Sequence, residues 1–328
     1  MWLIYALVRV KTLFTIETRE FGWDEIVAAA KLWGDWDRFV DKTREALACF
    51  LLASETNALP SVAKIREVTT AFRYARNLIS GEETQEWLQH WDMTIENWMD
   101  CLKAQSLRQC WAGRLTEIKC MEPISDQELE LVIKHHAICS GKLEQWTRKL
   151  AGHAAVAANT RQLPPTASAH DLIDFVEAEF DRARRQSMTP KHLATKISDH
   201  RLEWIHYDCR YLWFDQERVG REALWCIRDG MTLDEVAVTA RDEVKEWSFY
   251  ADEIDARIRP AFLAARQGDL LGPLKLRAGY PLFSLIRKTM PEVDDPQIIS
   301  RAETAIVANL TSQAINERVN WMVRFSCQ

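Results

Sequence analysis

The stretch that decides the fold is Gly268-Asp269-Leu270-Leu271-Gly272-Pro273-Leu274-Lys275, followed by Gly279-Tyr280-Pro281-Leu282-Phe283-Ser284-Leu285. A glycine turn leads into a short apolar run, which Gly-Pro stops, and a second apolar run begins after another glycine. This pattern predicts two short strands joined by a tight connection. Because almost all of the remaining chain has helical periodicity, the stretch marks a small sheet in a mostly helical protein.

The segment before this stretch also carries strand and helix signals. Aromatic and β-branched residues alternate with polar ones from Leu202 to Phe214, which predicts a strand. A helix is expected over 216–228, and Thr232 with Glu235 caps a short helix over 233–240. A mixed stretch, a helix over 254–263 and the two strands follow, and then a long helix over 298–319.

The first two hundred residues read as helices with clear start signals. Apolar residues recur at helical spacing over 23–53, with a break at Gly34-Asp35. Capping boxes at Ser80 and Ser125 open further helices, which continue to about residue 200. The apolar N-terminus is interrupted early by charges, so we expect a strand or helix that docks on the body, and neither a signal peptide nor a membrane span.

Composition narrows the function classes. The chain has 328 residues, of which 47% are hydrophobic and 27% charged, and its formal net charge is -6. No broad basic surface is expected, so nucleic acid is not an expected partner, and neither is a membrane. None of the eight cysteines forms a CxxC pair, which favours free thiols in the cytoplasm. No nucleotide-binding or metal motif is present, so no cofactor and no metal are expected.

Three motifs in the C-terminal half resemble the parvulin family of peptidyl-prolyl isomerases. The first is the helix, glycine turn and short helix of Ile227-Arg228-Asp229-Gly230-Met231-Thr232-Leu233-Asp234-Glu235-Val236-Ala237. The second is the helix and turn of Ile258-Arg259-Pro260-Ala261-Phe262-Leu263-Ala264-Ala265-Arg266-Gln267-Gly268-Asp269. The third is Leu271-Gly272-Pro273 with Gly279-Tyr280. The helices before this region resemble the chaperone arms of parvulin-type foldases, and the layout is also similar to parvulin-related proteins suggested to assist peptide maturation in bacteria.

The resemblance implies an α+β fold with four parts. These are a mostly helical, chaperone-like N-terminal domain over 1–122, a second helical segment over 123–200, a divergent parvulin-like antiparallel sheet domain over 201–290, and a C-terminal helix over 291–328 that packs back on the helical part.

The isomerase chemistry of the family is only partly represented. Parvulins combine an apolar pocket with two histidines and an acid or cysteine, but Pro281 stands where the second histidine is expected. The family's histidine on the first strand aligns near Cys209 or Arg210, neither of which is a histidine. The remaining candidates for catalysis are His206, Asp208 and Cys209.

A peptide-binding groove needs no histidine pair, so its residues are predicted separately. The candidates share an apolar or aromatic side chain in the parvulin-like region: Trp247, Ile258, Phe262, Tyr280 and Leu282.

Three functions stay open at this point. The preferred one is a peptide-binding, foldase-like or peptide-maturation accessory protein whose isomerase site is degenerate, in the cytoplasm. The second is an active peptidyl-prolyl cis-trans isomerase. The third is a helical subunit of a peptide-modifying enzyme complex. Expected partners are a peptide or an unfolded protein and a peptide-modifying enzyme.

Overall fold

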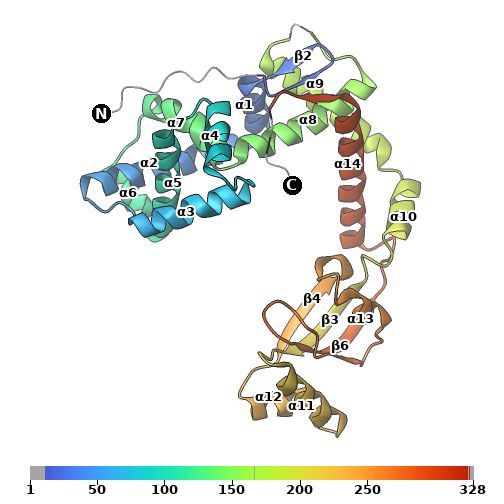
Figure 1. The fold of residues 1–328 in the computed structure, drawn as a ribbon. Coiled ribbons are helices and arrows are strands. Elements are labelled where there is room, and N and C mark those ends of the chain that lie inside the picture. The colour runs from blue at the N-terminus through green and yellow to red at the C-terminus, as the bar shows by residue number, and fades with distance from the viewer. Residues whose placement is uncertain (1–11, 166, 324, 326–328) are drawn as a thin grey trace. The chain divides into compact units, whose positions relative to one another are not determined.

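The computed structural model describes residues 12–165, 167–323 and 325. By its internal contacts the chain divides into two compact units. Unit 1 consists of Met1–Ala183 with Leu310–Gln328, and unit 2 is Arg184–Asn309. Each unit is built from its own layers of helices and strands (Figure 1). Unit 2 is therefore an insertion, because the chain leaves unit 1 and later returns to it.

Unit 1 is mainly helical. Its elements are β1 (Phe14–Ile16), β2 (Arg19–Phe21), α1 (Trp23–Leu32), α2 (Trp36–Glu55), α3 (Val62–Ala75), α4 (Gly81–His90), α5 (Ile95–Cys110), a 3-10 turn (Ala112–Arg114), α6 (Leu115–Met121), α7 (Asp126–Cys139), α8 (Lys142–Thr160), α9 (Ala169–Ser187), which ends in unit 2, and β7 (Val319–Trp321).

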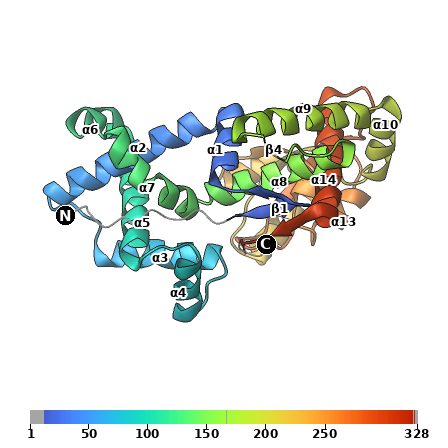
Figure 2. The same cartoon turned by 90° about the horizontal axis from the view of Figure 1, so that it is seen from above.

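Helices α2, α5 and α7 contact one another and form the centre of the helical packing in unit 1. Helix α2 contacts α5, α6 and α7, and α3 lies against α5 (Figure 2). The predicted caps at Ser80 and Ser125 are confirmed, since each accepts a hydrogen bond from the backbone at the third helical position, and Ser61 caps α3 in the same way. The break at Gly34 is confirmed too, since Gly34 has φ +71 between α1 and α2.

A small sheet joins the two ends of the chain in unit 1. Its strand order is β2-β1-β7, and all pairs are antiparallel. The register places Phe14 opposite both Phe21 and Trp321. The expected N-terminal element is thus a strand from residue 14 on, while residues 1–11 lie outside the described residues.

Unit 2 contains a four-stranded sheet with short helices. Its elements are α10 (Pro190–Asp199), β3 (His206–Leu212), α11 (Glu217–Arg228), α12 (Leu233–Ala240), β4 (Lys245–Tyr250), a 3-10 turn (Ala251–Glu253), α13 (Arg259–Ala264), β5 (Leu270–Leu271), β6 (Leu282–Thr289) and α14 (Pro296–Arg318), which ends in unit 1. The strand order is β4-β3-β6-β5, and every pair is antiparallel.

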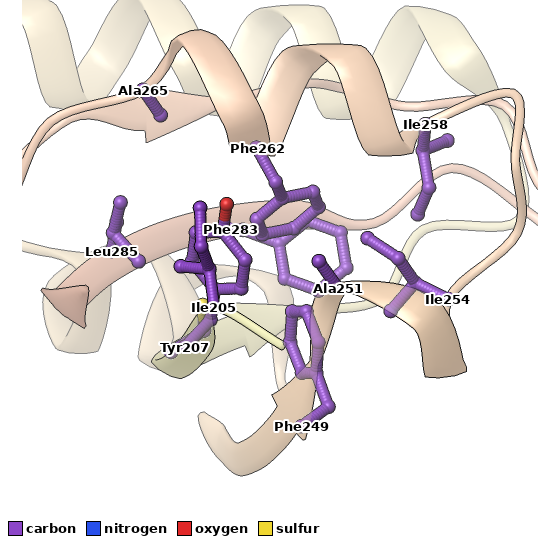
Figure 3. Packing of buried hydrophobic residues seen from close by; sticks show 11 residues of the cluster. Ile205, Tyr207, Phe249, Ala251, Ile254, Ile258, Phe262, Ala265, Phe283 and Leu285 are labelled. Atoms are coloured by element: carbon purple, nitrogen blue, oxygen red, sulfur yellow. The ribbon is translucent and has the colours of Figure 1, made fainter. Parts of the chain in front are cut away.

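The main core of unit 2 lies between this sheet and α13 (Figure 3). Phe262 points from α13 onto the sheet and is fully buried. Its ring lies edge-on to those of Tyr207, Phe249 and Phe283, with ring centroids 5.2–5.5 Å apart. Edge-to-face packing of this kind is favourable for aromatic rings beyond the area that it buries. A second cluster, which includes Leu212 and Leu282, packs against α11 and α12.

The predicted fold class is confirmed: the chain is α+β, with a helical N-terminal part, a small antiparallel sheet and a long C-terminal helix. The two strands of the 268–285 stretch are β5 and the start of β6, and they pair with each other. The domain boundaries at 122, 200 and 290 stay predictions. Within the described residues, no helix is long and apolar enough to cross a membrane.

Three predicted segments are corrected. The segment before the predicted 254–263 helix is a strand, β4, because Trp247 and Phe249 pair with β3. The helix itself begins only at Arg259, and residues 251–253 form a 3-10 turn. Strand β3 also begins later than predicted, at His206, because residues before it turn back on His200 through backbone hydrogen bonds from Glu203 and Trp204.

Candidate peptide-binding face of the four-stranded sheet

A β-bulge in the centre of the sheet determines which side chains share a face. Asp208 of β3 lies opposite Arg287 of β6, but the next residue, Cys209, lies opposite Leu285. The register therefore skips Ile286. A bulge of this kind redirects the side chains of the bulged strand. As a result Leu285 enters the core while Arg287 reaches Asp208 on the other face.

His206 and Asp208 lie together on the face away from α13. The Nδ1 of His206 is 3.8 Å from Oδ1 of Asp208. Asp208 accepts hydrogen bonds from Ser248 Oγ at 2.6 Å and Arg287 Nε at 2.7 Å. Partial burial acts to raise the pKa of Asp208, but these hydrogen bonds and the positive charge of Arg287 lower it below its usual value. The carboxylate is therefore already engaged by two donors.

Cys209 is separated from that pair by the sheet itself. It is buried in the core beneath α13. Burial, and secondarily the charge of Asp208, raise the pKa of its thiol to about 12. The thiol is thus held in its protonated form, which is a poor nucleophile. The structure brings together two of the three predicted catalytic residues and places the third on the opposite face.

The predicted peptide-binding residues also divide into separate places. Ile258 and Phe262 are buried in the core under α13, whereas Leu282 is buried in the second cluster, beside α12. Tyr280 is half-buried, and its backbone N–H donates to the carbonyl of Phe214 at 2.7 Å. These four residues do not line one common pocket.

Trp247 is the predicted binding residue that reaches solvent. It is 36% exposed, and it lies on β4. Its ring centroid is 4.3 Å from that of Phe249, 6.0 Å from Phe283 and 6.4 Å from Tyr211. Since Tyr211 is half-buried as well, these four rings form an aromatic patch that begins in the core and ends at the surface. Tyr211, Phe249 and Phe283 were not among the predicted binding residues, although Tyr211 and Phe283 belong to predicted strands.

The aromatic patch lies next to a free sheet edge. Strand β4 is the first strand in the order β4-β3-β6-β5, so within the described sheet one of its two edges has no neighbour. Four consecutive β4 residues, 245–248, are exposed. The unpaired backbone groups of an edge strand are a template for another extended chain. In strand addition, main-chain hydrogen bonds along such an edge give affinity, and the side chains beside it contact alternate residues of the added strand.

The described residues contain no group of three or more His, Cys, Asp and Glu side chains that could hold a metal ion. His200 instead hydrogen-bonds Glu203 and stacks on Trp204, with centroids 4.7 Å apart. His192 contacts the carbonyl of Ser187. The histidines around the helix-to-strand transition thus have local structural partners.

Comparison with known proteins agrees with the predicted resemblance. No protein-family model matches the chain, and no curated protein matches it. One matching structure is a peptidylprolyl isomerase (PrsA) from Bacillus cereus, at 13% identity and TM-score 0.33, over 68% of this chain and 88% of that chain. A second is foldase protein PrsA from Streptococcus pneumoniae, at 11% identity and TM-score 0.29, over 73% of this chain and 89% of that chain. A third is a SurA-like chaperone from Campylobacter jejuni, at 11% identity and TM-score 0.21, over 75% of this chain and 96% of that chain.

These structures are named as foldases, isomerases and chaperones of the kind that the sequence motifs resemble. At such identities and TM-scores the likeness carries no argument about the site or the activity of this chain.

Proposed function

We propose that this chain binds extended apolar peptide segments along β4 and over the aromatic patch of Tyr211, Trp247, Phe249 and Phe283. The observation that carries the proposal is the position of Trp247, which stands partly exposed on a free edge strand and packs on rings that continue into the core. The edge supplies backbone hydrogen bonds and the patch supplies apolar contact, which together suit an extended chain of loose sequence specificity.

We further propose that binding is not coupled to efficient prolyl isomerisation. The barrier to prolyl isomerisation is about 20 kcal/mol. An enzyme that accelerates the reaction needs groups that stabilise the twisted amide. Here Pro281 takes one expected histidine position, and the Cys209 thiol is buried away from His206 and Asp208. Ile258 and Phe262 are sealed in the core, so the apolar pocket for a proline ring is filled.

The first experiment measures the affinity of extended, proline-containing apolar peptides by calorimetry for the wild type and for Trp247→Ala. Loss of a partly buried aromatic anchor is expected to weaken binding by about tenfold or more. The matched control is Trp225→Ala, because Trp225 is 61% exposed on α11 and lies outside the patch. Wild-type protein that binds none of the peptides, or equal affinity of the two variants, would overturn the proposal.

A second experiment addresses turnover. A protease-coupled isomerisation assay is expected to give the uncatalysed rate with wild-type protein, and His206→Ala is expected to leave that rate unchanged. A clear acceleration that His206→Ala abolishes would favour the active isomerase instead.

The finer role that we propose is peptide maturation in the cytoplasm, in which the chain presents its bound peptide to a modifying enzyme. Its support is the sequence resemblance, together with the seven described cysteines, all of which are free. Affinity purification of the tagged chain with the products of its neighbouring genes tests this role. A short precursor peptide and a modifying enzyme that co-purify would support it, and recovery of neither would contradict it.

A further inference from the structure

Unit 1 contains a cavity that the function proposed for the sheet does not use. It lies among α2, α3, α5, α7 and the start of α8, and its volume is about 440 Å³. Sites for small molecules are typically about 300–1,000 Å³ in volume. Its apolar wall includes Phe39, Phe72 and Leu102.

The charged residues that line this cavity are all basic. They are Lys42 of α2, Arg76 directly after α3, Arg108 of α5 and Lys142 of α8. No aspartate or glutamate is among the lining residues, although the whole chain carries a formal net charge of -6. A concentration of positive charge in a partly enclosed, partly apolar space raises the local concentration of anions.

Arg76 is the best-placed of these cations for holding an anion. Its Nη2 donates to the carbonyl of Cys139 at 2.8 Å, and its guanidinium carbon lies 3.8 Å from the centre of the Phe72 ring. The side chain is therefore held by one hydrogen bond and by stacking on Phe72, and the centre of the Trp87 ring lies 6.0 Å from the guanidinium carbon. A guanidinium has five N–H donors, so the donors that do not face Cys139 are available to a ligand.

Among the described residues, no carboxylate forms an ion pair with Arg76. Burial lowers its pKa, and Glu144, whose field acts in the other direction, is itself paired with Arg148 at 2.9 Å. A partly buried cation without an ionic partner is costly, and an anion bound beside it would remove that cost. By contrast, Arg108 of the same cavity is already paired with Glu45 at 2.8 Å.

We propose that this cavity binds the carboxylate of a small ligand with an apolar body, with Arg76 as the group that fixes the carboxylate. Arg–carboxylate pairs are frequently bidentate, which orients the ligand as well as holding it. The apolar body then lies against Phe39 and Leu102. Either the C-terminal end of an apolar peptide or a free aromatic acid has this chemistry.

Calorimetry with the full chain tests the proposal with three probes. The first is the dipeptide N-acetyl-Leu-Phe with a free carboxylate, the second is 3-phenylpropionate, and the third is inorganic phosphate. The C-terminal amide of the dipeptide is the matched neutral ligand. We expect at least one of the two carboxylates to bind at millimolar concentration or below, and the dipeptide amide and phosphate to bind more weakly. Binding of the dipeptide alone identifies a peptide end, and binding of 3-phenylpropionate identifies a free acid.

The variant Arg76→Met is expected to weaken carboxylate binding by about tenfold to a hundredfold, because it removes a charge-assisted contact. Arg76→Lys keeps the charge but not the fork of donors, so an intermediate affinity is expected. Arg66→Met, on the exposed face of α3, is the control that should bind as the wild type does. Circular dichroism confirms that each variant is folded.

The proposal is overturned if neither carboxylate binds, if the amide binds as well as the acid, or if Arg76→Met has no effect in a folded variant. Because Trp247 lies in unit 2, failure of this cavity to bind a carboxylate leaves the peptide-binding test on the sheet unaffected, and the reverse is also true.

Discussion

The Nζ of Lys288 lies 2.7 Å from the carbonyl oxygen of Leu263, so a charged side chain from β6 closes the end of α13. The same Nζ also donates to the carbonyl of Ala265 at 3.0 Å. The last carbonyls of a helix have no partner within the helix, and a cation there is favourable. The bulge at Ile286 makes this contact possible, because it shifts the alternation of β6 so that Lys288 faces α13.

Replacement of Lys288 by methionine keeps the length of the side chain and removes the donor. We expect the free energy of unfolding to fall by about 1–3 kcal/mol, because buried carbonyls lose a charged partner. Urea denaturation measures the change. Lys245→Met, at an exposed position of β4, is the control and is expected to change stability by less than about 0.5 kcal/mol. Equal stability of both variants would show that α13 does not need this cap.

Asp208 should make the stability of unit 2 depend on pH. Burial acts to raise its pKa in the folded state, but the donors Ser248 and Arg287 and the neighbouring His206 outweigh burial, so the pKa is lowered. A lowered folded-state pKa stabilises the fold above the unfolded value, near 3.8, and this contribution is lost as pH falls through the lower folded value.

At neutral pH the free energy of unfolding of Asp208→Asn is therefore expected to be lower than that of the wild type by on the order of 1 kcal/mol. On acidification, the free energy of unfolding of the variant is expected to fall less than that of the wild type. The effect is modest because Arg287 is largely exposed. Urea denaturation across acid pH compares it with Asp294→Asn, an exposed position. Parallel pH curves for the wild type and Asp208→Asn would contradict the prediction.

Thiol labelling should separate Cys209 from Cys226 in the same unit. Cys226 is exposed, whereas Cys209 is buried with a thiol pKa of about 12. Under native, mildly alkaline conditions we expect an alkylating reagent to modify Cys226 quickly and Cys209 only as fast as the unit opens. Mass spectrometry of the digested protein reads out both sites. Similar rates at the two cysteines would mean that the core under α13 is open, and would restore Cys209 as a candidate nucleophile.

Gly279 is packed so closely against the backbone of Phe214 that a side chain at this position would clash with it. A Cβ there would lie 2.6 Å from the carbonyl oxygen of Phe214, which is too close for any carbon. Gly279→Ala is expected to destabilise unit 2 by about 2 kcal/mol or more. Gly230→Ala is the matched control, since Gly230 also has positive φ, +110, but nothing lies within 4 Å of its Cβ position. A larger loss at Gly230 than at Gly279 would contradict the steric argument.

Local signals were sufficient to predict several elements of this chain. Helix α12 has the predicted bounds, Leu233–Ala240, because its start is marked by the reciprocal hydrogen bonds of Thr232 and Glu235. These interactions span three residues and need nothing from elsewhere in the fold. The same reason applies to Ser80 and Ser125 in unit 1.

Features that depend on a partner strand were not predicted. The alternation of exposed Ser248 with buried Phe249 is visible in the sequence, but pairing with β3 is what makes the segment β4. The bulge is invisible from either strand alone, so the contact of Arg287 with Asp208 could not be predicted. The separation of Cys209 from Asp208, by contrast, follows from the alternation of side chains along a strand. The cavity around Arg76 is still harder to predict from the sequence, because its lining residues come from helices that are distant in the sequence.

The pairing of β1 with β7 has a consequence for biosynthesis. The strand beside residues 14–16 consists of residues 319–321, which are translated long after them because all of unit 2 lies between the two in the sequence. Domains generally fold as units during synthesis, and distant pairings form slowly. All of unit 2 can therefore emerge and fold while the first sheet of unit 1 still lacks a strand. A nascent chain halted before β7 would display β1 as an unpaired edge, which nascent-chain proteolysis or chaperone capture would detect.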